Sequence, residues 1–136
     1  MCIRDSTNGT FPDKLQKSLP YIDYIAMDIK APLDKYSEIT RVNVNCENIQ
    51  KSIDIIMNCG IDYEFRTTVL KSQLTFGDFE KIGQLIKGAK KYYLQKFVAS
   101  KTLDESLMNE ITYSNEEFEE IISLLNLNIN NVVLRV

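Results

Sequence analysis

Histidine is absent from this 136-residue chain, which removes the commonest general base and metal ligand from consideration. The three cysteines, at positions 2, 46 and 59, match no zinc or iron–sulfur spacing. Their odd, scattered arrangement indicates reduced thiols in a cytosol, and we expect Cys46 and Cys59 to be structural. The sequence contains no apolar run long enough to span a membrane and no secretory signal pattern, so it predicts a cytoplasmic protein.

The overall composition is ordinary for one globular domain or a piece of one, with 44% apolar and 26% charged residues. A net charge of −3 gives no basic surface of the kind that binds nucleic acid. The first six residues, "MCIRDS", resemble a translated sequencing-adapter fragment. We therefore set residues 1–6 aside as a non-native leader and expect residues 7–136 to be the tail of a longer protein.

Helical and strand patterns alternate along the chain, with strands rich in Ile, Tyr and Val and helices with apolar residues three or four apart. The Gly60 and Gly88 positions suit helix ends, and Thr75 with Asp78 is close to a capping box. The expected helices are 11–19, 46–60, one opening at Thr75 and one opening at Ser114; the expected strands are 22–30, 61–70, 91–99 and 130–136; residues 31–43 are expected to form a loop.

This alternation predicts an α/β fold built from parallel β-α-β units. Right-handed crossovers place the helices on one side of the sheet in a barrel and on both sides in an open sheet. Ligands of either architecture bind at the carboxyl ends of the strands.

Polar residues recur on one face of three successive strands, towards the later half of each strand. Because side chains alternate along a strand, Asp28 shares a face with Lys30, and Arg66 shares a face with Glu64 and Thr68. On the next strand, Gln95 lies on the face opposite Leu94. Three interpretations remain open: a core network that pairs Lys30 with Glu64 and Arg66 with Asp28, exposure at a sheet edge, or a ligand site.

The segment "TNGT" (7–10) contains an Asn-Gly pair, which favours a tight turn. Its place just before a helix predicts the end of a preceding strand. An ordinary strand-to-helix turn is the simpler alternative to a functional one.

Four segments in order, "TNGT", "DYIAMDIKAPLDKY", "YEFRTTV" and "YYLQKF", resemble the second half of radical S-adenosylmethionine (SAM) activating enzymes. The resemblance is to the anaerobic ribonucleoside-triphosphate reductase activating proteins, with the pyruvate formate-lyase activating enzymes as close relatives. It covers nearly all of residues 7–136. The fold that it implies is the C-terminal half of a partial (β/α)6 barrel, with helices on the outer face.

The resemblance also implies the chemistry. In this family a [4Fe–4S] cluster, held by a CxxxCxxC loop, cleaves SAM to a 5′-deoxyadenosyl radical, which takes a hydrogen atom from a glycine of the partner enzyme. The partner would be a glycyl radical enzyme, here anaerobic ribonucleoside-triphosphate reductase, and the electron donor a flavodoxin or ferredoxin. The protein would position the cofactor that carries out the reaction.

By resemblance, Thr7 and Asn8 would line the methionine end of SAM, and Asp28 and Lys30 would contact its carboxylate or ribose region. Thr7 and Asp28 would also hold a monovalent cation. The Arg66 guanidinium would point into the same pocket, and Gln95 would meet the adenine or the incoming peptide.

Two departures from the family pattern limit what this chain would do. The CxxxCxxC loop and the glycine-rich motif of the second strand are absent, so the chain alone is expected to bind no cluster and to be inactive. One alternative is a stand-alone α/β ligand-binding or interaction module without redox chemistry. Another is an aldolase-like barrel fragment with Lys30 as an amine nucleophile, which the neighbouring Asp28 disfavours.

Overall fold

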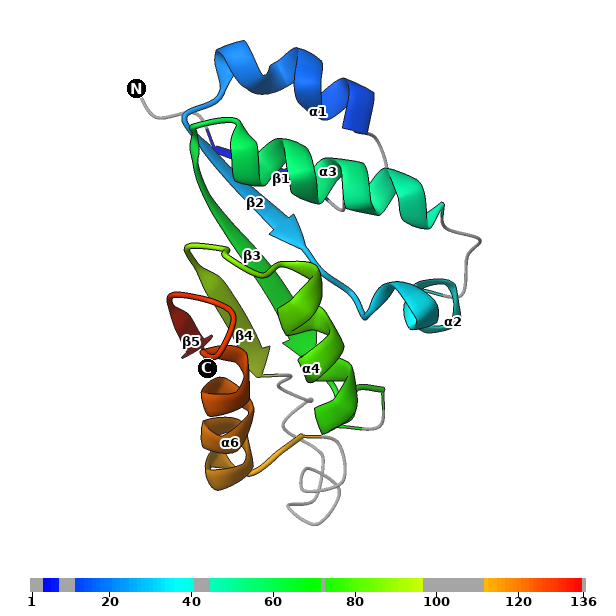
Figure 1. Cartoon of the computed structure of the whole chain (residues 1–136), viewed down its shortest axis with the longest axis vertical. Coiled ribbons are helices and arrows are strands. Elements are labelled where there is room, and N and C mark those ends of the chain that lie inside the picture. Colours follow the sequence, from blue (N-terminus) through cyan, green and yellow to red (C-terminus); the bar gives the residue numbers. More distant parts are fainter. Residues whose placement is uncertain (1–3, 8–11, 41–44, 72, 97–111, 136) are drawn as a thin grey trace, which may run out of the picture.

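The computed structural model describes residues 4–7, 12–40, 45–71, 73–96 and 112–135, with the backbone alone for 4–7. Helices and strands alternate throughout this part of the chain (Figure 1). The elements are β1 (Arg4–Thr7), α1 (Pro12–Ser18), η1 (Leu19–Tyr21), β2 (Tyr24–Asp28), η2 (Leu33–Lys35), α2 (Tyr36–Thr40), α3 (Cys46–Asn58), β3 (Asp62–Val69), α4 (Phe76–Leu85), β4 (Tyr92–Lys96), α6 (Asn115–Leu125) and β5 (Val132–Arg135).

The five strands form one parallel sheet in the order β1-β2-β3-β4-β5. Because each strand is followed by its neighbour in space, right-handed crossovers put the long helices on one face. Figure 1 shows α1, α3, α4 and α6 on that common face. The predicted α/β architecture, with parallel strands and helices on one side, is confirmed.

The hydrophobic core lies between this face and the helices. Strand side chains that point towards the helices are fully buried, including Ile25, Met27, Phe65 and Leu94. Burial of each such side chain stabilises the fold by about 1.5–3 kcal/mol relative to exposure. The alternate residues of the strands lie on the other face, as the alternation predicts; Asp28 and Arg66 there are partly exposed, whereas Glu64 is buried.

Local sequence signals set most helix boundaries. Thr75 caps α4 through a capping box with Asp78, and Ser114 caps α6 in the same way with Glu117. Just past the end of α3, Gly60 takes φ +77°, a conformation that favours glycine. These predicted boundaries are confirmed.

Two expectations differ from the structure. The predicted loop 31–43 contains η2 and α2, two short elements with too few residues for a periodic pattern. The segment set aside as a leader contributes Arg4–Ser6 to β1, which pairs with β2 from Arg4↔Tyr24 to Thr7↔Met27. The non-native origin of residues 1–6 stays a prediction.

None of the helices in the described ranges has the length and apolar character that a membrane crossing requires.

Candidate functional site

Asp28, the last residue of β2, meets Arg66 from the second half of β3. They are register partners in the parallel ladder, and Arg66 Nε lies 3.1 Å from Asp28 Oδ1. The other oxygen of Asp28, Oδ2, lies 3.7 Å from Lys30 Nζ. The exposed fraction of the side chain is 37% for Asp28, 28% for Arg66 and 47% for Lys30. Ion pairs this exposed contribute only about 0–1 kcal/mol to the stability of the fold. A gain in stability is therefore a weak explanation for three charged side chains at one place.

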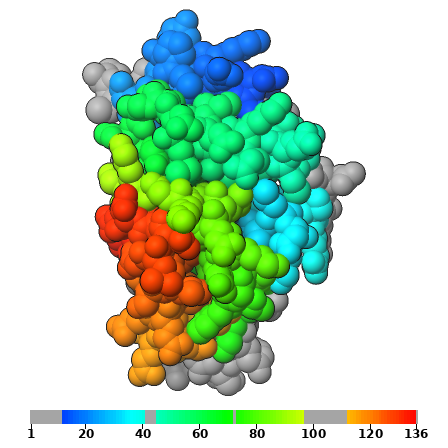
Figure 2. Space-filling model, in the orientation of Figure 1, coloured from blue at the N-terminus to red at the C-terminus, as the bar shows by residue number. Residues whose placement is uncertain are grey.

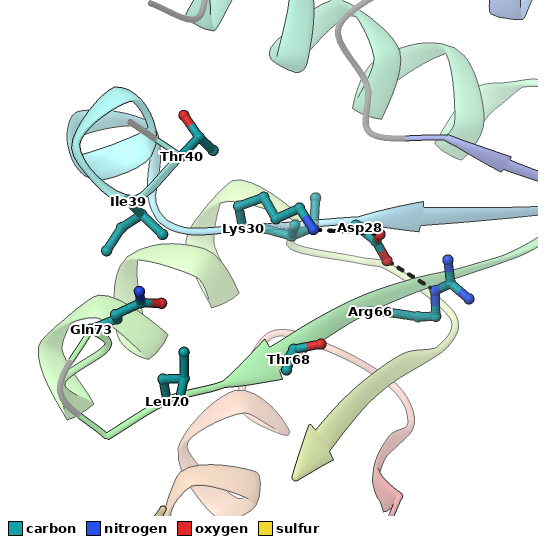
Figure 3. Close-up of a pocket in the computed structure, with 9 residues that line it drawn as sticks. Asp28, Lys30, Ile39, Thr40, Arg66, Thr68, Leu70 and Gln73 are labelled. Carbon is teal, nitrogen blue, oxygen red and sulfur yellow. Dashed lines mark hydrogen bonds and ion pairs between the residues drawn. The ribbon is translucent and has the colours of Figure 1, made fainter. Parts of the chain in front are cut away.

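A cavity of about 360 Å³ opens beside these three side chains (Figure 3). This volume is within the range of small-molecule sites, about 300–1,000 Å³. Figure 3 shows the side chains of Asp28, Lys30 and Arg66 along one margin and those of Leu70 and Gln73 across from Lys30. The lining residues are Asp28, Ile29, Lys30, Ile39, Thr40, Arg66, Thr68, Leu70 and Gln73. The acidic side chain of Asp28 and the basic side chains of Lys30 and Arg66 lie on one side of the cavity, and apolar and amide side chains lie on the other. This combination suits a ligand that carries both positive and negative charge.

The backbone that carries Asp28 and Lys30 is fixed by hydrogen bonds on both sides. The Tyr36 hydroxyl accepts from Lys30 N at 3.0 Å and donates to Asp28 O at 3.3 Å. Between them, Ile29 N donates to Arg66 O at 2.7 Å, and Ile29 O accepts from the Thr67 hydroxyl at 2.6 Å. Four successive backbone groups just beyond the strand end are therefore satisfied, which holds the two charged side chains in place.

The tyrosine hydroxyls behind this segment remain protonated. Burial raises the pKa of Tyr36 to about 12, against the lowering effect of its hydrogen bond from Lys30. Burial also raises the pKa of Tyr92, whose hydroxyl is hydrogen-bonded to that of Thr67. Both groups keep their proton at neutral pH and act as neutral hydrogen-bond partners.

A second polar cluster lies on the same face of the sheet. The buried Glu64 accepts a hydrogen bond from the Tyr24 hydroxyl at 2.8 Å, and its Oε2 lies 3.5 Å from Arg135 Nη1. The Arg135 guanidinium in turn stacks 3.7 Å from the Tyr93 ring centroid. Of the two pairs in the core-network interpretation, Arg66 with Asp28 is present, but Lys30 pairs with Asp28 and not with Glu64. Arg135 reaches Glu64 diagonally across β4, and Lys30 turns to the carboxylate two residues before it.

The remaining predicted site residues are distributed differently. Thr7 is the last residue of β1, next to Met27 in the register, but its side chain and all of Asn8 lie outside the described part of the chain. Gln95 is exposed on β4, paired in register with Thr68, and is not among the residues lining the cavity. The roles expected of Thr7, Asn8 and Gln95 stay predictions.

Several residues that line the site carry no signal in the sequence that marks them as site residues. Ile39 and Thr40 line the cavity from α2, and Leu70 and Gln73 line it from the β3–α4 connection. No strand or helix periodicity marks these positions. Tyr36 lies in the segment "DYIAMDIKAPLDKY", but its hydroxyl contacts Lys30 and Asp28, six and eight residues earlier, only because the chain folds back onto the end of β2.

The described residues do not fit an iron–sulfur cluster. They include no group of three His, Cys, Asp or Glu side chains placed to hold a metal ion. The thiols of Cys46 and Cys59 instead donate to backbone oxygens of Leu33 and Ile56, each at 3.2 Å.

Comparison with known proteins supports the resemblance seen in the sequence. No family model matches the chain. A curated protein of Methanocaldococcus jannaschii, named "Putative glycyl-radical enzyme activating enzyme", is 29% identical over 139 residues, which cover 98% of this chain and 58% of that protein. A crystal structure of a domain of pyruvate-formate lyase-activating enzyme from Bacteroides vulgatus has the same fold. It matches with a TM-score of 0.71 and 12% identity over 98% of this chain and 81% of that one.

The structural match establishes the fold, and the relative supports the glycyl-radical activase family. The chain spans less than two thirds of that relative's length.

Proposed function

We propose that this chain is the C-terminal part of a radical SAM enzyme that activates a glycyl radical enzyme. The observation that carries the proposal is the convergence of Asp28, Lys30 and Arg66 beside one cavity, towards the carboxyl ends of two parallel strands. Ligands of barrel folds bind at this end. The Methanocaldococcus relative and the ordered sequence motifs support the same family.

The charges of the site match those of SAM. The cofactor carries an amino group and a sulfonium, both positive, and one carboxylate, so its binding site needs both signs of charge. Lys30 or Arg66 would bind the carboxylate, with the planar Arg66 fork the better match. Asp28 would turn towards a positive group or a ribose hydroxyl. At present it accepts from Arg66 and lies near Lys30, so a ligand carboxylate would compete for one of these cations.

When bound beside a reduced cluster, SAM supplies the hydrogen-abstracting chemistry of the family. In this proposal the cluster ligands come from an earlier part of the protein, since the described residues do not fit one. We further propose anaerobic ribonucleoside-triphosphate reductase as the glycyl radical partner, flavodoxin or ferredoxin as the electron donor and a cytoplasmic location. The choice of partner and of electron donor depends on the resemblance of "MDIKAP" and "EFRTTV" to the reductase activases, and the location depends on the sequence pattern described above.

Calorimetric titration of the chain with SAM tests the proposal. We expect saturable binding that Asp28→Asn weakens about tenfold or more, because hydrogen bonds to charged groups contribute about 1.5–3 kcal/mol. Glu119→Gln, which removes an exposed carboxylate on α6, is the matched control and should leave the affinity unchanged. Failure of the unsubstituted chain to bind would favour the α/β interaction module without redox chemistry.

The choice of partner needs a separate experiment. A longer protein that contains this chain and a CxxxCxxC loop is incubated with SAM, a reductant and candidate glycyl radical enzymes. Electron paramagnetic resonance should detect a glycyl radical on anaerobic ribonucleotide reductase. A radical formed only on another enzyme of the class would transfer the assignment to that partner.

A further inference from the structure

The cavity has two walls that come from different connections of the sheet. One wall comes from the segment after β2, with Lys30, Ile39 and Thr40; the other comes from the segment after β3, with Leu70 and Gln73. Figure 3 shows Ile39 and Thr40 on the turns of α2, apart from Gln73 and Leu70. All five residues lie beyond the ends of β2 at Asp28 and β3 at Val69. Their spacing must therefore depend on contacts between the two connections.

One carboxylate oxygen joins these connections. Asp78 Oδ2 accepts from Lys35 Nζ at 2.8 Å and from the backbone of Thr75 at 2.9 Å. Asp78 is only 3% exposed. Thr75 is two residues beyond Gln73, so the same oxygen that completes the cap of α4 also anchors the end of η2.

The position of Lys35 extends this anchor to the charged side chains. Lys35 directly precedes Tyr36, whose hydroxyl contacts Asp28 O and Lys30 N. Tyr36 begins α2, which carries Ile39 and Thr40 into the cavity. A continuous set of contacts therefore runs from the start of α4, through Lys35 and Tyr36, to the end of β2.

A second ion pair between η2 and α4 provides a contrast. Lys81 Nζ lies 2.7 Å from Asp34 Oδ2, but these side chains are 56% and 58% exposed. Exposed pairs contribute little, whereas loss of one partner of a buried pair leaves an uncompensated charge. The ion pair of the buried Asp78 carboxylate is therefore expected to hold the two connections together more strongly than the exposed Asp34–Lys81 pair.

We propose that the Lys35–Asp78 ion pair is a positioning contact that holds the two walls of the cavity together and so sets its affinity for ligand. The ligand part rests on the proposed function, because SAM is the probe. The coupling between the walls does not depend on it and is measured separately.

Two measurements on the 136-residue chain test this positioning role. Hydrogen exchange reports the opening of the Lys30 amide and of α2, and calorimetry reports SAM affinity. Lys35→Met should speed exchange at these amides about tenfold and weaken SAM binding about 2- to 30-fold, the range found for residues that act through others. Lys35→Arg keeps the positive charge and should restore both values to near those of the unsubstituted chain. Lys81→Met, which removes the exposed pair, should leave both unchanged.

Lys35→Met leaves Asp78 buried and partly uncompensated, so a double variant guards against loss of folding. Lys35→Met/Asp78→Asn removes both charges and keeps an oxygen for the Thr75 amide; it should show the same faster exchange. Unchanged exchange in Lys35→Met, or in the double variant where the single one does not fold, would overturn the coupling. Faster exchange with unchanged SAM affinity would overturn the positioning role. If the unsubstituted chain binds no SAM while exchange responds as expected, the coupling stands and the proposed function fails.

Discussion

The Tyr36 hydroxyl accepts a hydrogen bond from the backbone N–H of Lys30 at 3.0 Å, which ties the start of α2 to the end of β2. The same hydroxyl donates to Asp28 O. Tyr36→Phe keeps the ring and removes these bonds, leaving partly buried backbone groups unsatisfied. We expect the free energy of unfolding to fall by about 1–3 kcal/mol in urea denaturation. Tyr21→Phe is the control, because Tyr21 is 74% exposed and should change stability little. Equal effects of the two substitutions would show that the Tyr36 hydroxyl fixes nothing.

The charge of Asp78 makes stability depend on pH in the acid range. Burial alone would raise the pKa of Asp78, but hydrogen bonds from Lys35 and Thr75 outweigh burial and hold the pKa below its usual 3.8. A lowered pKa in the folded state gives stability that is present above about pH 4 and is lost as the pH falls through the folded pKa. The difference in unfolding free energy between the chain and Asp78→Asn should therefore be constant near neutral pH and shrink below about pH 4. A difference that does not vary with pH would contradict this origin.

Phe65 tests the core beneath the site. Its side chain is fully buried on the helix-facing side of β3, directly before Arg66. Phe65→Ala should lower the free energy of unfolding by about 3–5 kcal/mol, the usual cost of a large cavity. Leu127→Ala removes a side chain that is 78% exposed and should have little effect. A loss below about 1 kcal/mol for Phe65→Ala would place the core elsewhere.

The Glu64–Arg135 contact links β5 to β3 across β4. Arg135→Met leaves the buried Glu64 carboxylate with Tyr24 as its hydrogen-bond partner among the described residues. We expect a loss of about 1–3 kcal/mol in urea denaturation, part of which Glu64→Gln recovers in the double variant because a neutral amide needs no cation. Strictly additive losses would show that the two residues do not interact.

The sequence allows prediction of the strands and of the shared face of Asp28 and Arg66, because side chains alternate along strands that pair in parallel. Alternation alone does not decide whether these two residues pair with each other or with a ligand. The partner of Glu64 could not be predicted, since Arg135 reaches it diagonally from a strand that is not adjacent to β3. Lys35 and Asp78 are 43 residues apart, and η2 and α2 are too short for a periodic signal. The relative position of the two cavity walls therefore depends on contacts between residues far apart in the sequence, which local sequence patterns do not encode.

The position of the SAM site can be mapped by ¹H–¹⁵N chemical shifts during titration of the isotope-labelled chain. A SAM site in this cavity predicts that the largest shifts occur at the amides of Lys30, Arg66, Thr68 and Gln73, which surround the cavity. It also predicts that Arg66→Met reduces them at the same SAM concentration. Absence of shifts at saturating SAM, or shifts confined to the groove of Asp13, Gln16 and Lys17 on α1, would contradict it.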